Sequence, residues 1–278
     1  MPHQAELEIL TQFEKKGYAS LSIGSTGTAC LVELVSAAQT YFDCKEEVKF
    51  RNSVKNRNNG YRPVGSAHAG NPDEFDLNDS FLYWNPERSR IIPGHREIAT
   101  MLNRLEIYRK TVAIYAMSRV VDELRLSYDY NKKLDFESAS LLQVNSFASP
   151  SNRELLQTRH EDGVVATILW TDASGLEGCN EEKLTSLQPG PDEVLIMPGG
   201  ILSAMTGGGI RPFYHQVRNC GILGRKSVMY FSCFDVNRGP IAPFVVNASN
   251  RHTDIRRLIL SSTDMFGLAE NFVVASDE

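Results

Sequence analysis

Two histidines and one aspartate in this chain have the types and the spacing of a metal site. His160 and Asp162 stand two residues apart, and a second histidine, His215, follows much later in the sequence. Side chains of an extended strand alternate between its two sides, so His160 and Asp162 are expected to point the same way, with Glu161 opposite. Two imidazoles and one carboxylate hold non-haem Fe(II) and leave half of its coordination sphere open. The fold must then bring His215 to the local pair.

A cation and a hydroxyl lie beyond the second histidine, at Arg225 and Ser227. They open an apolar segment that is typical of a strand, and by alternation they share one face of it, opposite to Lys226. A guanidinium bonds both oxygens of a carboxylate, and a hydroxyl beside it adds a further donor. The pair therefore predicts a binding site for a carboxylate.

The bulk composition is that of an ordinary soluble globular protein. The chain has 278 residues, 42% of them hydrophobic, and a net charge of −5 without any dense basic tract, which argues against nucleic acid as a partner. Five cysteines without a C-x-x-C pair indicate reduced thiols. The polar N-terminus and the lack of a long apolar run indicate neither a signal peptide nor a membrane span. We therefore expect a cytoplasmic protein that does not bind a membrane.

Helical periodicity dominates the first half of the chain. The predicted helices cover Gln4 to Lys16, Ala29 to Phe42 and about Glu97 to Leu126, the last as one long helix or a close pair of helices. Between the first two, the alternating segment from Tyr18 to Ile23 predicts a short strand. The first half is therefore expected to be mainly helical.

Short strands dominate the second half. They are predicted at Leu141 to Phe147, Val164 to Trp170, Glu193 to Met197 and Ser227 to Phe234. Because turn residues and no regular helix separate them, a sandwich or jelly roll is favoured over a parallel sheet. No linker divides the chain, so we predict a single domain over residues 1–278 of the mainly β class with flanking helices (α+β). In it, a helix-rich region 1–130 packs on a jelly-roll core at about 135–240, and a helical segment follows at 250–270.

Several segments together resemble the isopenicillin N synthase-like family of Fe(II)/2-oxoglutarate-dependent oxygenases. The similar segments are Gln157 to Glu177, Pro189 to Gly200, His215 to Val217 and Arg225 to Ser227, with Phe13 to Ser22, Tyr41-Phe42 and Gly60-Tyr61 upstream. Their order and spacing agree along most of the chain. The resemblance implies a double-stranded β-helix core, which is the jelly roll of cupin-like proteins.

The resemblance also implies an activity. His160, Asp162 and His215 would bind Fe(II), and the protein would consume 2-oxoglutarate and O₂ and release succinate and CO₂. It would oxidise an unactivated C–H bond of a small molecule, by hydroxylation or desaturation, in secondary metabolism. We expect a monomer or a homodimer.

The cosubstrate site is implied in the same way. Arg225 and Ser227 would bind the distal carboxylate of 2-oxoglutarate, and Asn145 matches the asparagine of the family's Asn-Tyr-Tyr-Pro segment. The sequence departs from the family two residues later, where Phe147 replaces a tyrosine that often helps to bind the cosubstrate.

Substrate contacts are expected from two segments that correspond in the family to elements covering the active site. Their candidates are Tyr61, Arg62, His68, Phe81 and Tyr83. A small acidic substrate would need a cation such as Arg62. Aromatic residues at alternating positions, such as Phe81 and Tyr83, are also typical of a core.

Two other functions stay open at this point. The first is an Fe(II) oxidase or cyclase of the same fold that takes all electrons from its substrate and uses no 2-oxoglutarate, which the missing phenol at Phe147 allows. The second is a non-catalytic jelly-roll protein that binds a metal or a small acid. The chain has a complete set of metal ligands and also a complete carboxylate-binding pair, Arg225 and Ser227. This argues against the second function, because a binding module needs only one of the two.

Overall fold

The helices lie mainly in the first half of the chain and the strands mainly in the second. The computed structural model describes residues 8–53, 59–68, 73–84, 94–130, 134–137, 139–148, 150–180, 183–236, 241–248 and 250–265. The helices are α1 (Glu8–Lys16), α2 (Gly24–Phe42), α3 (Glu46–Phe50), α4 (Arg96–Tyr108), α5 (Ile114–Tyr128), α6 (Gly200–Met205) and α7 (Ile255–Met265), with a π-helical turn, η1 (Arg109–Ala113), between α4 and α5. The strands are β1 (Ala19–Ser22), β2 (Gly60–Arg62), β3 (Asp79–Trp84), β4 (Leu141–Phe147), β5 (Leu155–His160), β6 (Ala166–Thr171), β7 (Leu176–Asn180), β8 (Lys183–Ser186), β9 (Glu193–Pro198), β10 (His215–Arg218) and β11 (Arg225–Ser232).

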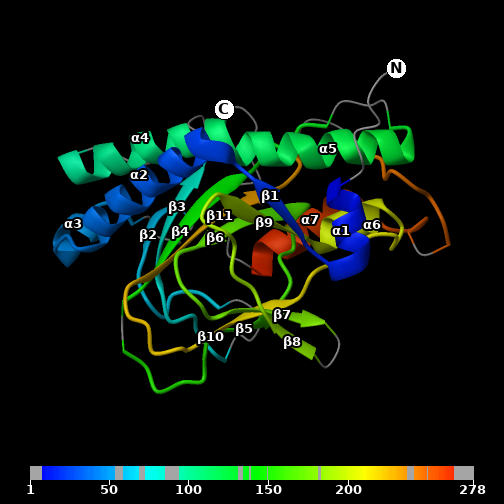
Figure 1. The fold of residues 1–278 in the computed structure, drawn as a ribbon. Coiled ribbons are helices and arrows are strands. Elements are labelled where there is room, and N and C mark those ends of the chain that lie inside the picture. The colour runs from blue at the N-terminus through cyan, green and yellow to red at the C-terminus, as the bar shows by residue number, and fades with distance from the viewer. Residues whose placement is uncertain are drawn as a thin grey trace, which may run out of the picture.

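Two antiparallel sheets form the β core. The large sheet has the order β1-β9-β6-β11-β4-β3-β2, and the small sheet has the order β5-β10-β7-β8. In Figure 1 the long helices α2, α4 and α5 lie along one side of the large sheet, and the small sheet lies on its other side. This arrangement confirms the predicted jelly-roll core with flanking helices.

Strand alternation gives the large sheet one face toward the helices and one toward the small sheet. The helix-facing side includes Val144, Ile168 and Val228, which share a buried cluster with Leu34 and Tyr41 of α2. Burying each such aliphatic side chain contributes about 1.5–3 kcal/mol. The helices therefore cover and stabilise one face of the large sheet.

The other side, which we call the inward face, contributes to a second buried cluster. Phe147, Leu169 and Met229 of the large sheet meet Leu156 and Val217 of the small sheet there. The same face carries polar residues at alternate positions of the same strands, so the space between the sheets is only partly an apolar core.

The predicted elements agree with the structure in most of the large sheet and differ in the small one. Strands β1, β4, β6, β9 and β11 occur where alternation predicts them, and the long predicted helix is one run interrupted by η1. The prediction that no helix separates the strands is wrong, because α6 stands between β9 and β10. The sequence patterns predict neither the four strands of the small sheet nor β2 and β3 of the large one. Residues 4–7 of the first predicted helix and 266–270 of the last lie outside the described residues.

The five cysteines are free thiols, as their odd number and spacing predict. Across the described ranges, no helix combines the length and the hydropathy that a membrane span requires.

Glu106, a partly buried acid of α4, should make the free energy of unfolding depend on pH. Burial alone would raise the pKa of Glu106, but hydrogen bonds from Arg109 and Lys110 lower it to about 2. The stability that ionised Glu106 contributes is therefore present above about pH 4.5 and is lost as the pH falls toward 2. We expect Glu106→Gln to reduce the free energy of unfolding at neutral pH by roughly 1 kcal/mol, since solvent screens the pair. Denaturant unfolding at pH 7 and pH 3 measures this: the deficit should shrink at pH 3, and an exposed control, Glu47→Gln, should show none.

Candidate metal centre

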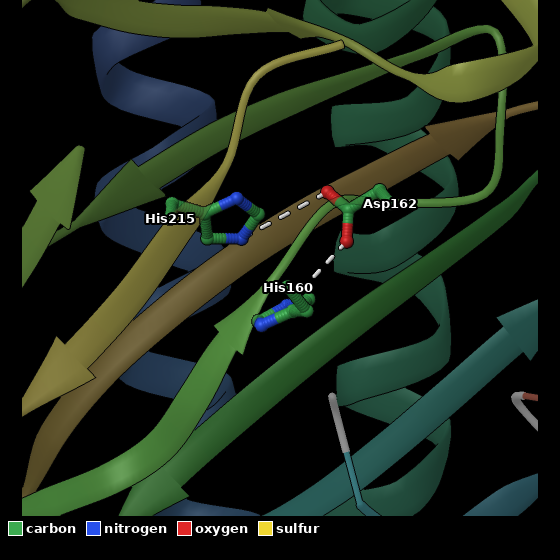
Figure 2. Close-up of side chains that lie close together, drawn as sticks. All are labelled: His160, Asp162 and His215. Carbon is green, nitrogen blue, oxygen red and sulfur yellow. Dashed lines mark ion pairs between the residues drawn. The ribbon is translucent and has the colours of Figure 1, made fainter. Parts of the chain in front are cut away.

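The structure brings His160, Asp162 and His215 together at one end of the small sheet. His160 is the last residue of β5 and His215 is the first of β10, and the two are directly paired across the strands. Their Nε2 atoms lie 3.7 and 4.0 Å from the two carboxylate oxygens of Asp162. Figure 2 marks both contacts with dashed lines. One ligand atom from each residue lies within 4.8 Å of the others. Two atoms that bind one ion at about 2.0–2.2 Å are at most about 4.4 Å apart, so these side chains can share an ion after a small inward adjustment.

The backbone that presents Asp162 is a turn and not a strand. The sequence predicted an extended segment through His160 and Asp162, but β5 ends at His160, and the amide of Val164 donates to the carbonyl oxygen of Asp162 at 2.7 Å. This two-residue hydrogen bond folds the chain sharply. Glu161 does point away, as predicted, and its carboxylate accepts from the amide of Gly200 at 2.8 Å.

Gly199 allows the chain at the start of α6 to pack closely against the Asp162 turn. A Cβ atom on Gly199 would lie 2.3 Å from the carbonyl oxygen of Asp162 and 2.2 Å from that of Val164. Both neighbours are backbone atoms that cannot rotate away. Glycine is therefore needed here for close approach and keeps the Asp162 turn in place.

Hydrogen bonds fix the orientation of two of the three ligand side chains. The Nδ1 atom of His160 lies 2.7 Å from the carbonyl oxygen of Thr158, which can only accept, so Nδ1 carries the proton and Nε2 presents its lone pair. The Thr167 hydroxyl donates to one carboxylate oxygen of Asp162 at 2.6 Å. Burial lowers the pKa of His160, which keeps the imidazole neutral and able to bind a metal. Two imidazoles around a buried carboxylate are a donor set that fits a divalent ion.

Thr167 offers a test of this arrangement, because its side chain is fully buried and has the shape of valine. Thr167→Val should weaken the binding of Mn(II), a spectroscopic substitute for Fe(II), by about 10–100-fold, whereas Thr167→Ser should retain it. Titration followed by electron paramagnetic resonance measures the free ion directly. Thr171→Val, on the same strand, is the matched control and should bind Mn(II) normally. Equal affinity in wild type and Thr167→Val would show that the hydroxyl does not position Asp162.

A buried cation lies on the inward face at the start of β11. Arg225 is 3% exposed and pairs with Phe147 in register, while Ser227 pairs with Asn145. The guanidinium carbon of Arg225 lies 4.9 Å from the Phe147 ring centre, and its Nε donates to the carbonyl oxygen of Ala173 at 3.4 Å. Its Nη1 has no hydrogen-bond partner in the part of the chain that the structure describes. Burial lowers the pKa of Arg225 to about 10. A buried guanidinium with an unpaired donor can bind an anion such as a carboxylate.

Three of the candidate substrate residues face the helices. Phe81 pairs with Tyr61 in register and packs edge-on against Tyr41, with ring centres 5.0 Å apart. The hydroxyls of Tyr61 and Tyr83 donate to Asp79 and Glu106, respectively. Tyr61, Phe81 and Tyr83 are buried in the helix-facing cluster, as expected of core aromatics.

Arg62 is placed differently. It pairs with Ser80, which in turn pairs with Asn145, so it shares the inward face with the cosubstrate candidates. It is 8% exposed. His68 lies in the loop after β2, and its buried Nδ1 has no hydrogen-bond partner within the described ranges.

The comparisons with known proteins find solved structures of the same fold but no match by sequence. No protein-family model and no curated protein matches the chain. A full-length protein from Neurospora crassa, solved with alpha-KG, superimposes with a TM-score of 0.73 at 16% identity and covers 94% of this chain and 90% of its own. A Caulobacter crescentus protein assigned to the 2OG-Fe(II) oxygenase family gives 0.72 at 20% identity, covering 92% of each chain. The fold is that of the 2-oxoglutarate and Fe(II) oxygenases.

A plant structure agrees with this result. The dioxygenase for auxin oxidation 1 from Arabidopsis thaliana, solved with 2-oxoglutarate, has a TM-score of 0.67 at 18% identity and covers 90% of this chain and 97% of its own. Identities this low establish a shared architecture. Chemistry must be argued from the residues of this chain.

Proposed function

We propose that the protein is an Fe(II)- and 2-oxoglutarate-dependent oxygenase that oxidises an unactivated C–H bond of a small molecule. The observation that carries the proposal is the buried guanidinium of Arg225, whose Nη1 has no hydrogen-bond partner among the described residues. It lies on the same inward face as Thr167, which supports the metal ligand Asp162. His160, Asp162 and His215 would hold Fe(II) through one atom each. When bound, iron and the keto acid supply the oxidising chemistry, with succinate and CO₂ as products.

The protein's own residues supply position and shielding from water. Arg225 would bind the distal carboxylate of 2-oxoglutarate through its planar fork, and the Ser227 hydroxyl would add a donor. Asn145 lies beside Ser227 in register and would contact the cosubstrate. Phe147 cannot donate a hydrogen bond as a tyrosine would, but its ring supports the Arg225 guanidinium from one side.

The finer parts of the proposal rest on the resembling segments and on the chain's composition. They are membership of the isopenicillin N synthase-like family, a role in secondary metabolism, a single domain over residues 1–278, a cytoplasmic location and a monomeric or homodimeric state. Structural neighbours support a small-molecule substrate, since the Neurospora crassa protein has been solved with thymine and with 5-formyluracil. The inward position of Arg62 supports its role as a contact to that substrate.

Stoichiometry tests the proposal against its alternatives. With Fe(II), 2-oxoglutarate and O₂, the protein should form one succinate for each O₂ consumed, slowly without substrate and faster with it. O₂ consumption without succinate would overturn the proposal in favour of a 2-oxoglutarate-independent oxidase. Consumption of neither would favour a non-catalytic metal-binding protein.

A further inference from the structure

Solvent reaches the inward face of the three central strands of the large sheet at two positions. On the central strands β4, β6 and β11, the inward-facing residues are buried except for Gln143 and Phe231, which are partly exposed. Central strands between two sheets normally have their inward side chains covered. The partial exposure of these two therefore marks space above them that side chains do not fill.

This space adjoins the metal centre and the cosubstrate pair. Phe231 pairs in register with Thr167, whose hydroxyl binds the Asp162 carboxylate. Gln143 pairs with Met229, two residues closer to Ser227 along β11. The two exposed residues thus lie between the support of the metal ligands and the proposed carboxylate site.

The amide of Gln143 is oriented for recognition. Its Nε2 donates to the side-chain oxygen of Asn145 at 2.8 Å, which fixes the plane of the amide. Its Oε1 makes no hydrogen bond to any described residue. This carbonyl oxygen is therefore available to accept a hydrogen bond from a ligand that enters the space. Beside it, Phe231 offers an apolar aromatic surface.

We infer that Gln143 and Phe231 determine substrate specificity and select a molecule that has an apolar body and carries an N–H or O–H donor. The inference rests on the proposed function and names the substrate class for that site. Gln143 Oε1 accepts from the donor, and the Phe231 ring packs on the apolar body. An analogue without the donor binds less well, because it leaves the amide oxygen unpaired.

Probe pairs that differ only in the donor test the inference. The probes are indole with 1-methylindole and phenol with anisole, titrated without O₂ into protein loaded with Mn(II) and 2-oxoglutarate. Enhanced relaxation of probe protons by Mn(II), with Zn(II)-loaded protein as the diamagnetic reference, reports both affinity and proximity to the metal centre. Wild type should bind the donor-bearing member of each pair about tenfold more tightly. Gln143→Leu should remove the preference, Phe231→Leu should weaken both members equally, and the exposed control Gln39→Leu should behave as wild type.

The outcomes separate this inference from the proposed function. Visible absorption of the Fe(II)–2-oxoglutarate complex in wild type tests the proposed function alone. If the complex forms but wild type shows no donor preference, or Gln143→Leu keeps it, the inference is overturned and the function stands. Donor preference without Mn(II)-dependent relaxation places the probes elsewhere and also overturns it. Loss of the absorption in Gln143→Leu would show that Gln143 acts through Asn145 on the cosubstrate, which again contradicts the inference.

Discussion

Arg225→Met should make the protein more stable in the absence of cosubstrate and should strongly weaken cosubstrate binding. In the structure the guanidinium is buried against Phe147 and lacks a carboxylate partner among the described residues. Replacing a buried charge by an apolar side chain of similar length should raise the free energy of unfolding by about 1–4 kcal/mol. The same change removes one partner of a buried charge pair in the complex, which should weaken 2-oxoglutarate binding by about 2–5 kcal/mol.

Thermal unfolding and equilibrium dialysis with labelled 2-oxoglutarate measure the two effects. Arg218→Met is the matched control, because Arg218 is partly exposed and forms ion pairs with Glu154 and Glu177. It should lose some stability and bind the cosubstrate normally. A less stable Arg225→Met protein that still binds 2-oxoglutarate would mean that Arg225 serves the fold and not the site.

His215→Ala should remove metal binding almost completely. The imidazole is one of only three side-chain ligands among the described residues at this centre. Loss of a partner that merely orients a ligand costs about 10–100-fold in affinity, so loss of a ligand itself should exceed about 100-fold. Metal titration should show this, and succinate formation should fall to background. His252→Ala, an exposed histidine, should change neither quantity.

The metal ligands could be predicted because part of the evidence is local in sequence. His160 and Asp162 stand close together, and Arg225 and Ser227 follow from alternation within one strand. The fold class followed from strand length and turn residues. These features need no knowledge of which strands pair.

The small sheet could not be predicted, because its strands do not have an apolar pattern. Strand β5 includes Gln157, Thr158 and Arg159, and β10 is only four residues long. Such segments become strands through pairing with partners far along the chain, which single-sequence patterns do not contain. This is also why Asp162 was expected in a strand and lies in a turn.

The substrate side of the site depends on register. Alternation shows that Phe81 and Tyr83 share a face, but not that the face is turned toward the helices. Thr167, Gln143 and Phe231 become neighbours of the site only through the pairing of β4, β6 and β11. A one-residue shift in that pairing would turn each side chain to the opposite face.

The most direct test of the central claim is the visible spectrum of the protein with Fe(II) and 2-oxoglutarate in the absence of O₂. Chelation of iron by the keto acid at the His160, Asp162 and His215 centre should give a weak metal-to-ligand absorption band. The band should be present in wild type and absent in His215→Ala. A wild-type protein without the band, or a His215→Ala protein that keeps it, would contradict the assignment of the site.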